Sequence, residues 1–189
     1  MLLKNIRKFN VFLIFVFLLN VCYSQYKANV MLLINEEYSR SILNFIKNSQ
    51  KSIYIIMFQT GYYPEHPESV SNQILKKLIE AGKRNVKVEV ILDLSKESSV
   101  KEKNMKTAEF LSENGIKVYF DKETKTTHIK LVIIDEKYVF TGSHNWNYYA
   151  LEKNNEISVL IDSEELARSL IEYFKKLKKG CKLYRISNN

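Results

Sequence analysis

One stretch of the chain, from His128 to Asn145, constrains its fold more strongly than any other. The apolar run 131–134 is typical of a buried strand, the polar triplet 135–137 of a turn, and residues 138–141 of a returning strand. Two strands joined by so short a turn form an antiparallel hairpin. We therefore expect a hairpin that brings the two polar ends of this stretch together.

Pairing of Ile134 with Tyr138 would set the register of this hairpin, and the ladder then puts Gly142 opposite Lys130. Because strand side chains alternate, the imidazole and the ammonium group that precede the apolar run share one face. The polar side chains expected at this end of the hairpin are His128, Lys130, Ser143, His144 (opposite His128) and Asn145. Such a set suits an anionic oxyester, above all a phosphodiester.

Strand and helix patterns alternate along the rest of the chain. Strands are expected at residues 29–34, 52–58, 87–93, 117–120 and 155–161, and helices at 38–47, 71–81, 100–114, 146–151 and 163–179. A length of 189 residues suits one well-buried domain. We predict a single α/β domain over residues 26–186, with a mixed sheet flanked by helices on both faces.

Residues 1–24 have a different character. Three basic residues precede an apolar run at 11–19, and the small pair Cys22 and Ser24 follows it with the spacing of a cleavage site. This pattern is typical of a secretory signal peptide. The run is short for a bilayer span, which needs about 20 apolar residues, so a retained membrane anchor is the second interpretation. Lipid attachment at Cys22 is a weaker one, because Val21 is bulky. We expect an exported protein, periplasmic or extracellular.

The charge of the chain favours a polyanionic partner. The formal net charge is +8, of which residues 1–24 contribute +3 with no acid, so the remainder carries +5. Basic exported proteins are attracted to nucleic acid, anionic lipid headgroups or cell-wall polymer, and net charge does not choose among these. Cleavage of the leader would leave Cys181 as the one cysteine, which excludes a disulfide within the mature chain.

The polar residues of the hairpin have the spacing His128-x-Lys130-x-x-x-x-Asp135, followed by Gly142-Ser143-x-Asn145. This spacing resembles the HKD motif of the phospholipase D superfamily, and in particular its short, secreted, single-motif endonuclease branch. The resemblance implies a phospholipase D-like fold and phosphodiester cleavage without a cofactor. It also implies that two chains build one active site.

The resemblance assigns the chemistry to an imidazole. An ordinary pKa of about 6.5 leaves His128 largely neutral at pH 7, able to attack phosphorus and form a phosphohistidine. The leaving alkoxide needs a proton, and a second imidazole has a suitable pKa. In the family that acid is the histidine of the other motif, here His128 of a second subunit. We therefore predict a two-fold homodimer with its axis through the site.

Four more residues match positions with roles in the family. Lys130 and Asn145 would hold the non-bridging phosphate oxygens and stabilise charge in the transition state. Ser143 would add a hydroxyl hydrogen bond. Glu156, eleven residues after Asn145, matches the acid that orients the nucleophilic imidazole.

Other residues of the motif region receive structural roles. Asp135 lies about six residues along the strand from His128, roughly 20 Å at 3.3 Å per residue, so we assign it to the turn. Gly142 is counted with it as a motif position. His144 departs from the common pattern and is expected in a packing or substrate-side role. His66 has no partner in the sequence, and three scattered histidines predict no metal site.

Three functions remain open at this point. The leading one is an endonuclease acting on DNA or RNA with little sequence specificity. Stacking faces for bases are expected from Trp146, Tyr148, Tyr149, Tyr62 and Tyr63, although Trp146 fits core packing equally well. The alternative is hydrolysis of an anionic phospholipid such as cardiolipin, with an apolar approach to the site for acyl chains. A non-catalytic nucleic-acid-binding module fits the intact motif poorly.

Overall fold

The computed structural model describes residues 25–94, 97–122 and 124–186. The two interpretations of residues 1–24, signal peptide and anchor, lie outside these ranges. Among the described residues, none of the helices has the length and apolar character needed to cross a membrane.

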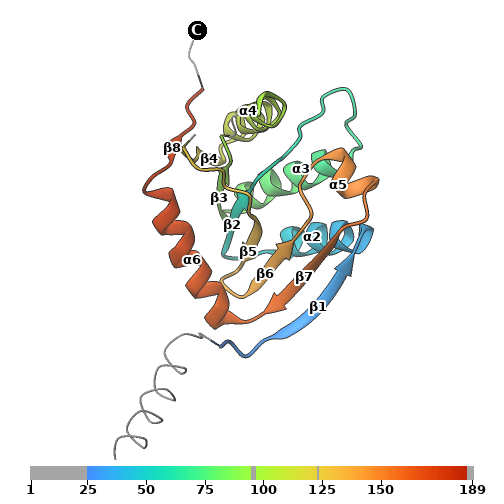
Figure 1. Cartoon of the computed structure of the whole chain (residues 1–189), viewed down its shortest axis with the longest axis vertical. Coiled ribbons are helices and arrows are strands. Elements are labelled where there is room, and N and C mark those ends of the chain that lie inside the picture. Colours follow the sequence, from blue (N-terminus) through green and yellow to red (C-terminus); the bar gives the residue numbers. More distant parts are fainter. Residues whose placement is uncertain (1–24, 95–96, 123, 187–189) are drawn as a thin grey trace, which may run out of the picture.

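The described residues form one eight-stranded sheet and five helices (Figure 1). The strands are β1 (Asn29–Ile34), β2 (Ser52–Met57), β3 (Lys87–Leu92), β4 (Lys117–Phe120), β5 (Lys130–Ile134), β6 (Tyr138–Gly142), β7 (Ile157–Asp162) and β8 (Lys182–Leu183). The helices are α2 (Glu36–Asn48), α3 (Val70–Lys83), α4 (Ser98–Glu113), α5 (Tyr148–Glu152) and α6 (Glu164–Lys178). The strand order is β1-β7-β6-β5-β2-β3-β4-β8, with β2, β3 and β4 parallel and the other pairs antiparallel.

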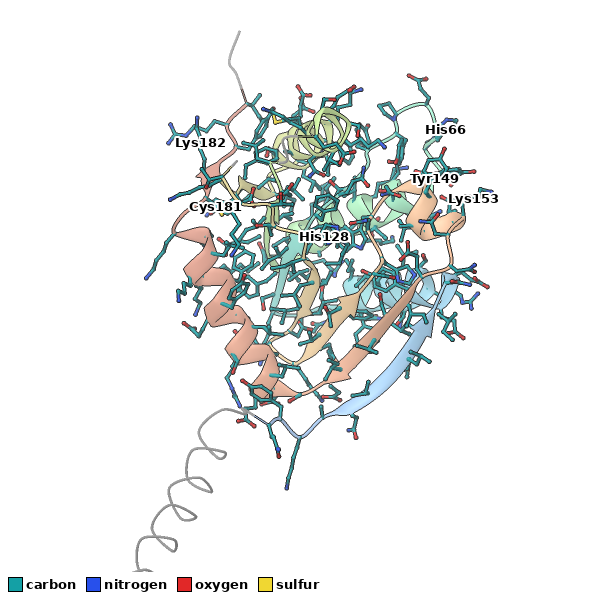
Figure 2. The ribbon with its side chains drawn as sticks, in the orientation of Figure 1. His66, His128, Tyr149, Lys153, Cys181 and Lys182 are labelled. Carbon is teal, nitrogen blue, oxygen red and sulfur yellow. The ribbon has the colours of Figure 1, made fainter. Side chains whose placement is uncertain are left out.

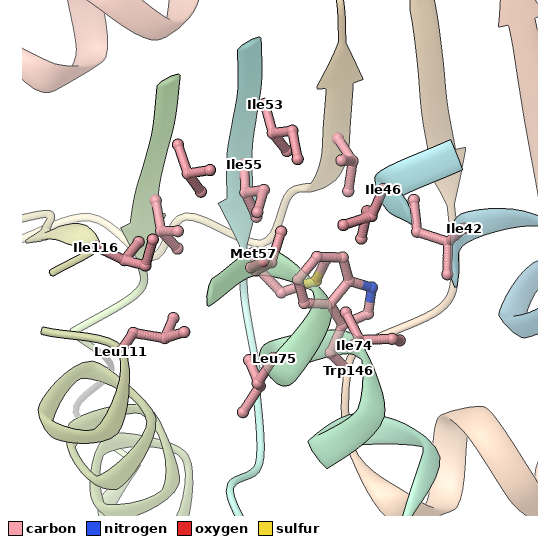
Figure 3. Close-up of a cluster of buried hydrophobic side chains, with 14 of the residues drawn as sticks. Ile42, Ile46, Ile53, Ile55, Met57, Ile74, Leu75, Leu111, Ile116 and Trp146 are labelled. Carbon is pink, nitrogen blue, oxygen red and sulfur yellow. The ribbon is translucent and has the colours of Figure 1, made fainter. Parts of the chain in front are cut away.

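Both faces of the sheet are covered by helices, as the sequence predicts. On one face a large core joins the sheet to α2, α3 and α4, and Figure 3 shows Trp146 inside it beside Met57 and Ile74. On the other face α6 packs on β2, β5 and β6, with Ile171 and Phe174 buried against the strands. The alternation of apolar residues in β2 and β5 supplies both cores, which is why these central strands are buried along their whole length.

Two elements differ from the sequence prediction. The helix expected at 146–151 begins only at Tyr148, because Trp146 forms a parallel bridge with Thr60 and the Asn147 side chain caps the helix by accepting from the Ala150 N–H (3.0 Å). Strand β8 was not predicted, since two residues carry no periodic pattern; it adds to the sheet edge through Leu183, which pairs with Tyr119.

The hairpin register is confirmed over four pairs, from Ile134 with Tyr138 to Leu131 with Thr141. The ladder ends there: the expected continuation, Gly142 opposite Lys130, is not among its pairs, and on their other sides Gly142 pairs with Ser158 of β7 and Lys130 with Met57 of β2. A Cβ on Gly142 would collide with the backbone of β7, so glycine permits this close approach.

Asp135 ties the turn of the hairpin to the start of β2. Its carboxylate accepts hydrogen bonds from the backbone N–H groups of Gln50 (2.9 and 3.0 Å), Lys51 (2.7 Å) and Ser52 (3.1 Å). Both Asp135 and Glu136 have positive φ, as a tight hairpin turn requires. The geometry agrees with the turn role assigned from the sequence.

We expect Asp135→Ala to lower the free energy of unfolding by about 2–3 kcal/mol, because three N–H groups lose a charged acceptor. Asp162→Ala is the matched control: this carboxylate lies on the same sheet and makes a half-exposed ion pair with Lys137 (3.5 Å), worth less than about 1 kcal/mol. Urea unfolding followed by circular dichroism measures both. Equal losses in the two variants would show that Asp135 does not hold the turn.

Candidate active site

Five residues predicted for the site lie where several strands begin or end. We call this border of the sheet, which is formed by strand ends and not by an outer strand, the site edge. They are His128, two residues before β5; Lys130, the first residue of β5; Ser143, directly after β6; Asn145; and Glu156, directly before β7. Since these three strands are successively antiparallel, the start of β5, the end of β6 and the start of β7 meet at this edge. The carboxyl ends of the parallel strands β2, β3 and β4 reach the same edge, the usual place for a ligand site in such sheets.

His128 is exposed on this edge and rests on an aromatic ring (Figure 2). Its imidazole lies 4.4 Å from the Phe58 ring, centroid to centroid, at 52°. The Phe58 N–H donates to the carbonyl of Ile129 (2.8 Å), which fixes the two segments together. Partial burial, and then the positive charge of Lys130, hold the pKa of His128 below its ordinary value. At neutral pH the imidazole is therefore neutral, the form that can act as a nucleophile.

Lys130 brings a charge directly to this imidazole. Its Nζ lies 3.2 Å from each ring nitrogen of His128 and donates to the His128 carbonyl oxygen (3.1 Å). It also lies 4.7 Å from the centre of the Phe58 ring. The side chain is 9% exposed, and this burial lowers its pKa, while the charges of Glu156 and Asp93 raise it. The buried ammonium is thus aimed at the place where an anion bound beside His128 would lie.

Ser143 and Glu156 form a linked pair on the neighbouring strands. The Ser143 hydroxyl donates to the Glu156 carboxylate and accepts from the Ile157 N–H (3.0 Å), and Asn154 Nδ2 donates to the other carboxylate oxygen (3.0 Å). In the part of the chain that the structure describes, no hydrogen bond joins Glu156 to His128. The orientation of the imidazole by Glu156 stays a prediction, and the observed effect of this carboxylate is electrostatic, on Lys130.

Asn145 has a polar atom without a partner. Its side chain is half-buried, and its Oδ1 is buried with no hydrogen bond to any described residue. Buried polar atoms in folded proteins are nearly always paired, so an unpaired carboxamide at this edge points to a ligand group. An amide oxygen only accepts hydrogen bonds, so the predicted role of Asn145 in holding a phosphate requires its Nδ2 donor and stays a prediction.

His144 takes the packing role, one of the two considered, and does not face His128. It is 1% exposed, its ring stacks on Tyr38 at 4.3 Å, and its Nδ1 lies 2.7 Å from the Ser158 hydroxyl. The Asn35 carbonyl, 3.1 Å from Nε2, occupies the other ring nitrogen. Burial lowers the pKa of His144, which keeps it neutral. The ladder of the hairpin ends at Leu131 with Thr141, so its extension does not place this ring, which is held by the Ser158 hydroxyl and the Asn35 carbonyl.

The aromatic residues proposed as stacking faces lie in different surroundings. Trp146 is 1% exposed, donates from Nε1 to the Tyr38 hydroxyl (2.9 Å) and fills the core, so its assignment to base stacking is wrong. One face of Tyr62 is covered by Phe110, with parallel rings 3.9 Å apart. Tyr63 is half-buried, and its hydroxyl accepts from the Tyr148 N–H (3.2 Å).

The sequence reading missed a pair of carboxyl groups beneath the site. Asp93 and Asp121 directly follow β3 and β4 and are buried. The Asp93 carboxylate accepts from the N–H of Thr127, the residue before His128, at 2.6 Å. Burial, assisted by the nearby Asp121, raises the pKa of Asp93 to about 6. The two acids could have been found from the sequence, because each directly follows an apolar strand and the two strands are adjacent. Nothing in the sequence marks Phe58 as a residue of the site.

Within the described ranges, no group of three or more His, Cys, Asp or Glu side chains is placed to hold a metal ion. The site edge presents the exposed imidazole of His128, the neighbouring ammonium group of Lys130 and the half-buried carboxamide of Asn145. It can bind a phosphate group and present a neutral imidazole to it. One chain supplies one such imidazole, because His144 is buried.

Comparisons with known proteins agree with this geometry. A family model described as "Cardiolipin synthase, PLD-like domain" matches residues 42–178. Phospholipase D of Rickettsia conorii is 34% identical over 134 residues, which cover 71% of this chain and 60% of that protein. The mitochondrial cardiolipin hydrolase of Homo sapiens is 31% identical over 67 residues, 35% of this chain and 27% of that protein. The chain thus spans about 60% of the length of the curated bacterial relatives it matches.

Two solved structures share the fold. Nuc from Salmonella typhimurium, a phospholipase D family member, aligns with a TM-score of 0.71 and 24% identity over 85% of this chain and 100% of its own. NucT from Helicobacter pylori aligns with a TM-score of 0.66 and 20% identity over 84% of this chain and 100% of its own. At these identities the likeness establishes the fold alone.

Removal of the Lys130 charge tests the electrostatics of the site. In Lys130→Met the pKa of His128 should rise toward its ordinary value of about 6.5, because one of the two causes that lower it is gone. An NMR titration of the histidine ring protons measures this shift, with His144, whose lowered pKa comes chiefly from burial, as internal reference. Lys137→Met, at the far end of the hairpin, is the matched variant. A His128 titration that is the same in both variants contradicts this account.

Proposed function

The chain belongs to the phospholipase D-like family of phosphodiesterases, and on that premise we propose that it is an exported endonuclease that cleaves DNA or RNA through a phosphohistidine intermediate. The observation that carries the proposal is the exposed, neutral imidazole of His128 with the Lys130 ammonium 3.2 Å from its ring nitrogens. Export rests on the leader pattern of residues 1–24.

The proposed reaction has two displacements. A ring nitrogen of His128 attacks phosphorus, the bond to the leaving strand breaks, and that alkoxide takes a proton from a second imidazole. Water then attacks the phosphohistidine and gives its proton to the same second imidazole, so both histidines return to their starting forms. Lys130 and Asn145 hold the non-bridging oxygens through both steps.

A basic flank beside His128 supports nucleic acid as the substrate. Two cavities lie near the end of β4, one lined by Phe120 and the other by Asp121, and the second is also lined by Thr127, next to His128. The basic residues that line them are Lys101, Lys122, Lys125, Lys176, Lys182 and Arg185. Several cations near the nucleophile suit a polyanionic strand, whose phosphates repeat along its length.

The second candidate is an enzyme that hydrolyses an anionic phospholipid. It is favoured by the names of the relatives, phospholipase D and mitochondrial cardiolipin hydrolase. The phosphodiester chemistry would be the same, and the basic flank would bind headgroups. The two candidates differ in substrate and not in mechanism, so a direct comparison of substrates separates them.

A second copy of the chain is proposed as the source of the second imidazole. Helix α6 covers β2, β5 and β6 and leaves β1 and β7 open on its side of the sheet (Figure 1). The large apolar residues exposed there form what we call the apolar edge face: Val30, Leu32, Ile34 and Ile157. Since Ile157 directly follows Glu156, this face begins at the active site, and a copy docked on it would place its own site nearby.

The substrate prediction is tested with plasmid, single-stranded DNA, RNA and cardiolipin vesicles, each in EDTA. We expect nucleic acid to be cleaved with metal removed, because the imidazole supplies the nucleophile, and His128→Ala to lose at least roughly 10³-fold in rate. Lys137→Met is the control for a change on the same hairpin outside the site. Intact nucleic acid with cleaved cardiolipin would sink the nuclease proposal in favour of the lipid enzyme.

The dimer is tested on the apolar edge face with two adjacent substitutions. Leu32→Asp should convert the protein to monomers and abolish cleavage, because it puts a charge into the proposed contact. Met31→Asp is the matched control, since Met31 is equally exposed (57% against 55%) but points to the opposite face of β1. Light scattering gives the mass, and the plasmid assay gives the activity. Fully active monomers refute the shared site.

A further inference from the structure

A cavity of about 800 Å³ opens on the other side of the site from the basic flank. It lies between α5 and the loop that precedes α3, and Figure 2 shows His66 and Tyr149 at its position near the edge of the molecule. We call it the acidic tyrosine pocket; its lining includes Tyr63, Tyr148, Tyr149, Glu65, Glu68 and Glu152. The catalytic scheme above uses none of these side chains.

The pocket is joined to the active site by short, hydrogen-bonded connections. Tyr148 follows Asn145 by three residues, and three residues span at most about 11 Å. The segment between them is pinned to the loop, because Trp146 donates to the Gln59 carbonyl (3.0 Å) and accepts from the Gly61 N–H (2.7 Å). A group attached to a phosphate at Asn145 is therefore within reach of the pocket.

The charge of the pocket is opposite to that of the chain as a whole. Three carboxylates and the ammonium group of Lys103 line it, and the Lys153 Nζ lies 5.4 Å from the centre of the Tyr148 ring, whereas the whole chain carries +8. Carboxylates repel a phosphate backbone, so the sugar-phosphate chain belongs on the basic flank. Tyrosine rings, in contrast, offer faces on which a flat base can stack, and Tyr149 is 63% exposed.

Glu152 is placed to read the edge of such a base. One oxygen of its carboxylate accepts from the Val70 N–H at 3.2 Å, which fixes the side chain against the first turn of α3. The other oxygen has no hydrogen bond with any residue that the structure describes. A fixed carboxylate accepts a hydrogen bond from an exocyclic amino group, such as N4 of cytosine, and repels a carbonyl oxygen at the same place.

We infer that the acidic tyrosine pocket binds one unpaired nucleobase beside the scissile phosphate and prefers a base with an exocyclic amino group over uracil or thymine. The inference rests on the proposed nuclease function and narrows its substrate to single strands with a local base preference. An unpaired base is required because a base inside a duplex presents no free face for stacking.

The test is calorimetric titration of the full chain with CMP and with UMP, which share sugar and phosphate and differ at position 4 of the base. We expect CMP to bind about tenfold more tightly. Tyr149→Ala should weaken both ligands, while Met31→Ala, at an exposed residue of β1, is the control. Glu152→Gln keeps an acceptor for Val70 and adds an amide donor, so the preference for CMP should vanish.

Parallel plasmid and single-strand cleavage assays separate this inference from the function on which it rests. If nucleic acid is cleaved but CMP and UMP bind equally well, the inferred base preference of the pocket is refuted and the proposed nuclease function still stands. A preference for CMP that survives Glu152→Gln also overturns it. Displacement of CMP by choline would assign the pocket to a cationic lipid headgroup instead. If nucleic acid is not cleaved and CMP and UMP bind equally well, both the proposed nuclease function and the inferred base preference are refuted.

Discussion

The fold depends on one carboxylate that joins two distant parts of the chain. Asp135 sits in the turn between β5 and β6 and accepts from three consecutive N–H groups at the entry to β2, more than 80 residues earlier. This contact sets the hairpin antiparallel to β2, in the centre of the sheet. The far end of β5, with His128 and Lys130, is thereby delivered to the edge where β2, β3 and β4 end. Asp135, at the opposite end of β5 from His128, thus helps to fix the position of the active site.

The site itself is organised by the burial of a single ammonium group. Lys130 is almost fully enclosed, and an enclosed cation needs nearby negative charge. The charges of Glu156 and Asp93 supply it, since both raise the pKa of Lys130. As a result the cation stays beside His128 and keeps that ring neutral, while its positive charge remains available to an incoming phosphate. The basic flank and the acidic tyrosine pocket extend this division of charge across the surface.

Sequence reasoning reached the hairpin because its signals are local. Four apolar residues, a three-residue turn and the return strand fix the register from Ile134 to Leu131 without knowledge of the rest. It failed where a longer-range contact decides. His144 was placed by extending that ladder past its last pair, whereas its ring stacks on Tyr38 and contacts the Ser158 hydroxyl. Trp146 was offered to the substrate because an aromatic run looks alike in a core and on a surface, and only packing against α2 and α3 separates the two.

The titratable groups around the edge have opposite effects on acid stability. His144 and His128 have pKa values below the 6.5 of an unfolded chain, so their contribution is complete above pH 6.5 and is lost as the pH falls through the folded values. Asp93, raised to about 6, takes up its proton in the folded state first, and the folded form gains stability as the pH falls from 6 toward 4. The two proton linkages run in opposite directions below pH 6.5. Protonation of Asp93 therefore offsets part of the stability that the two histidines lose in mild acid.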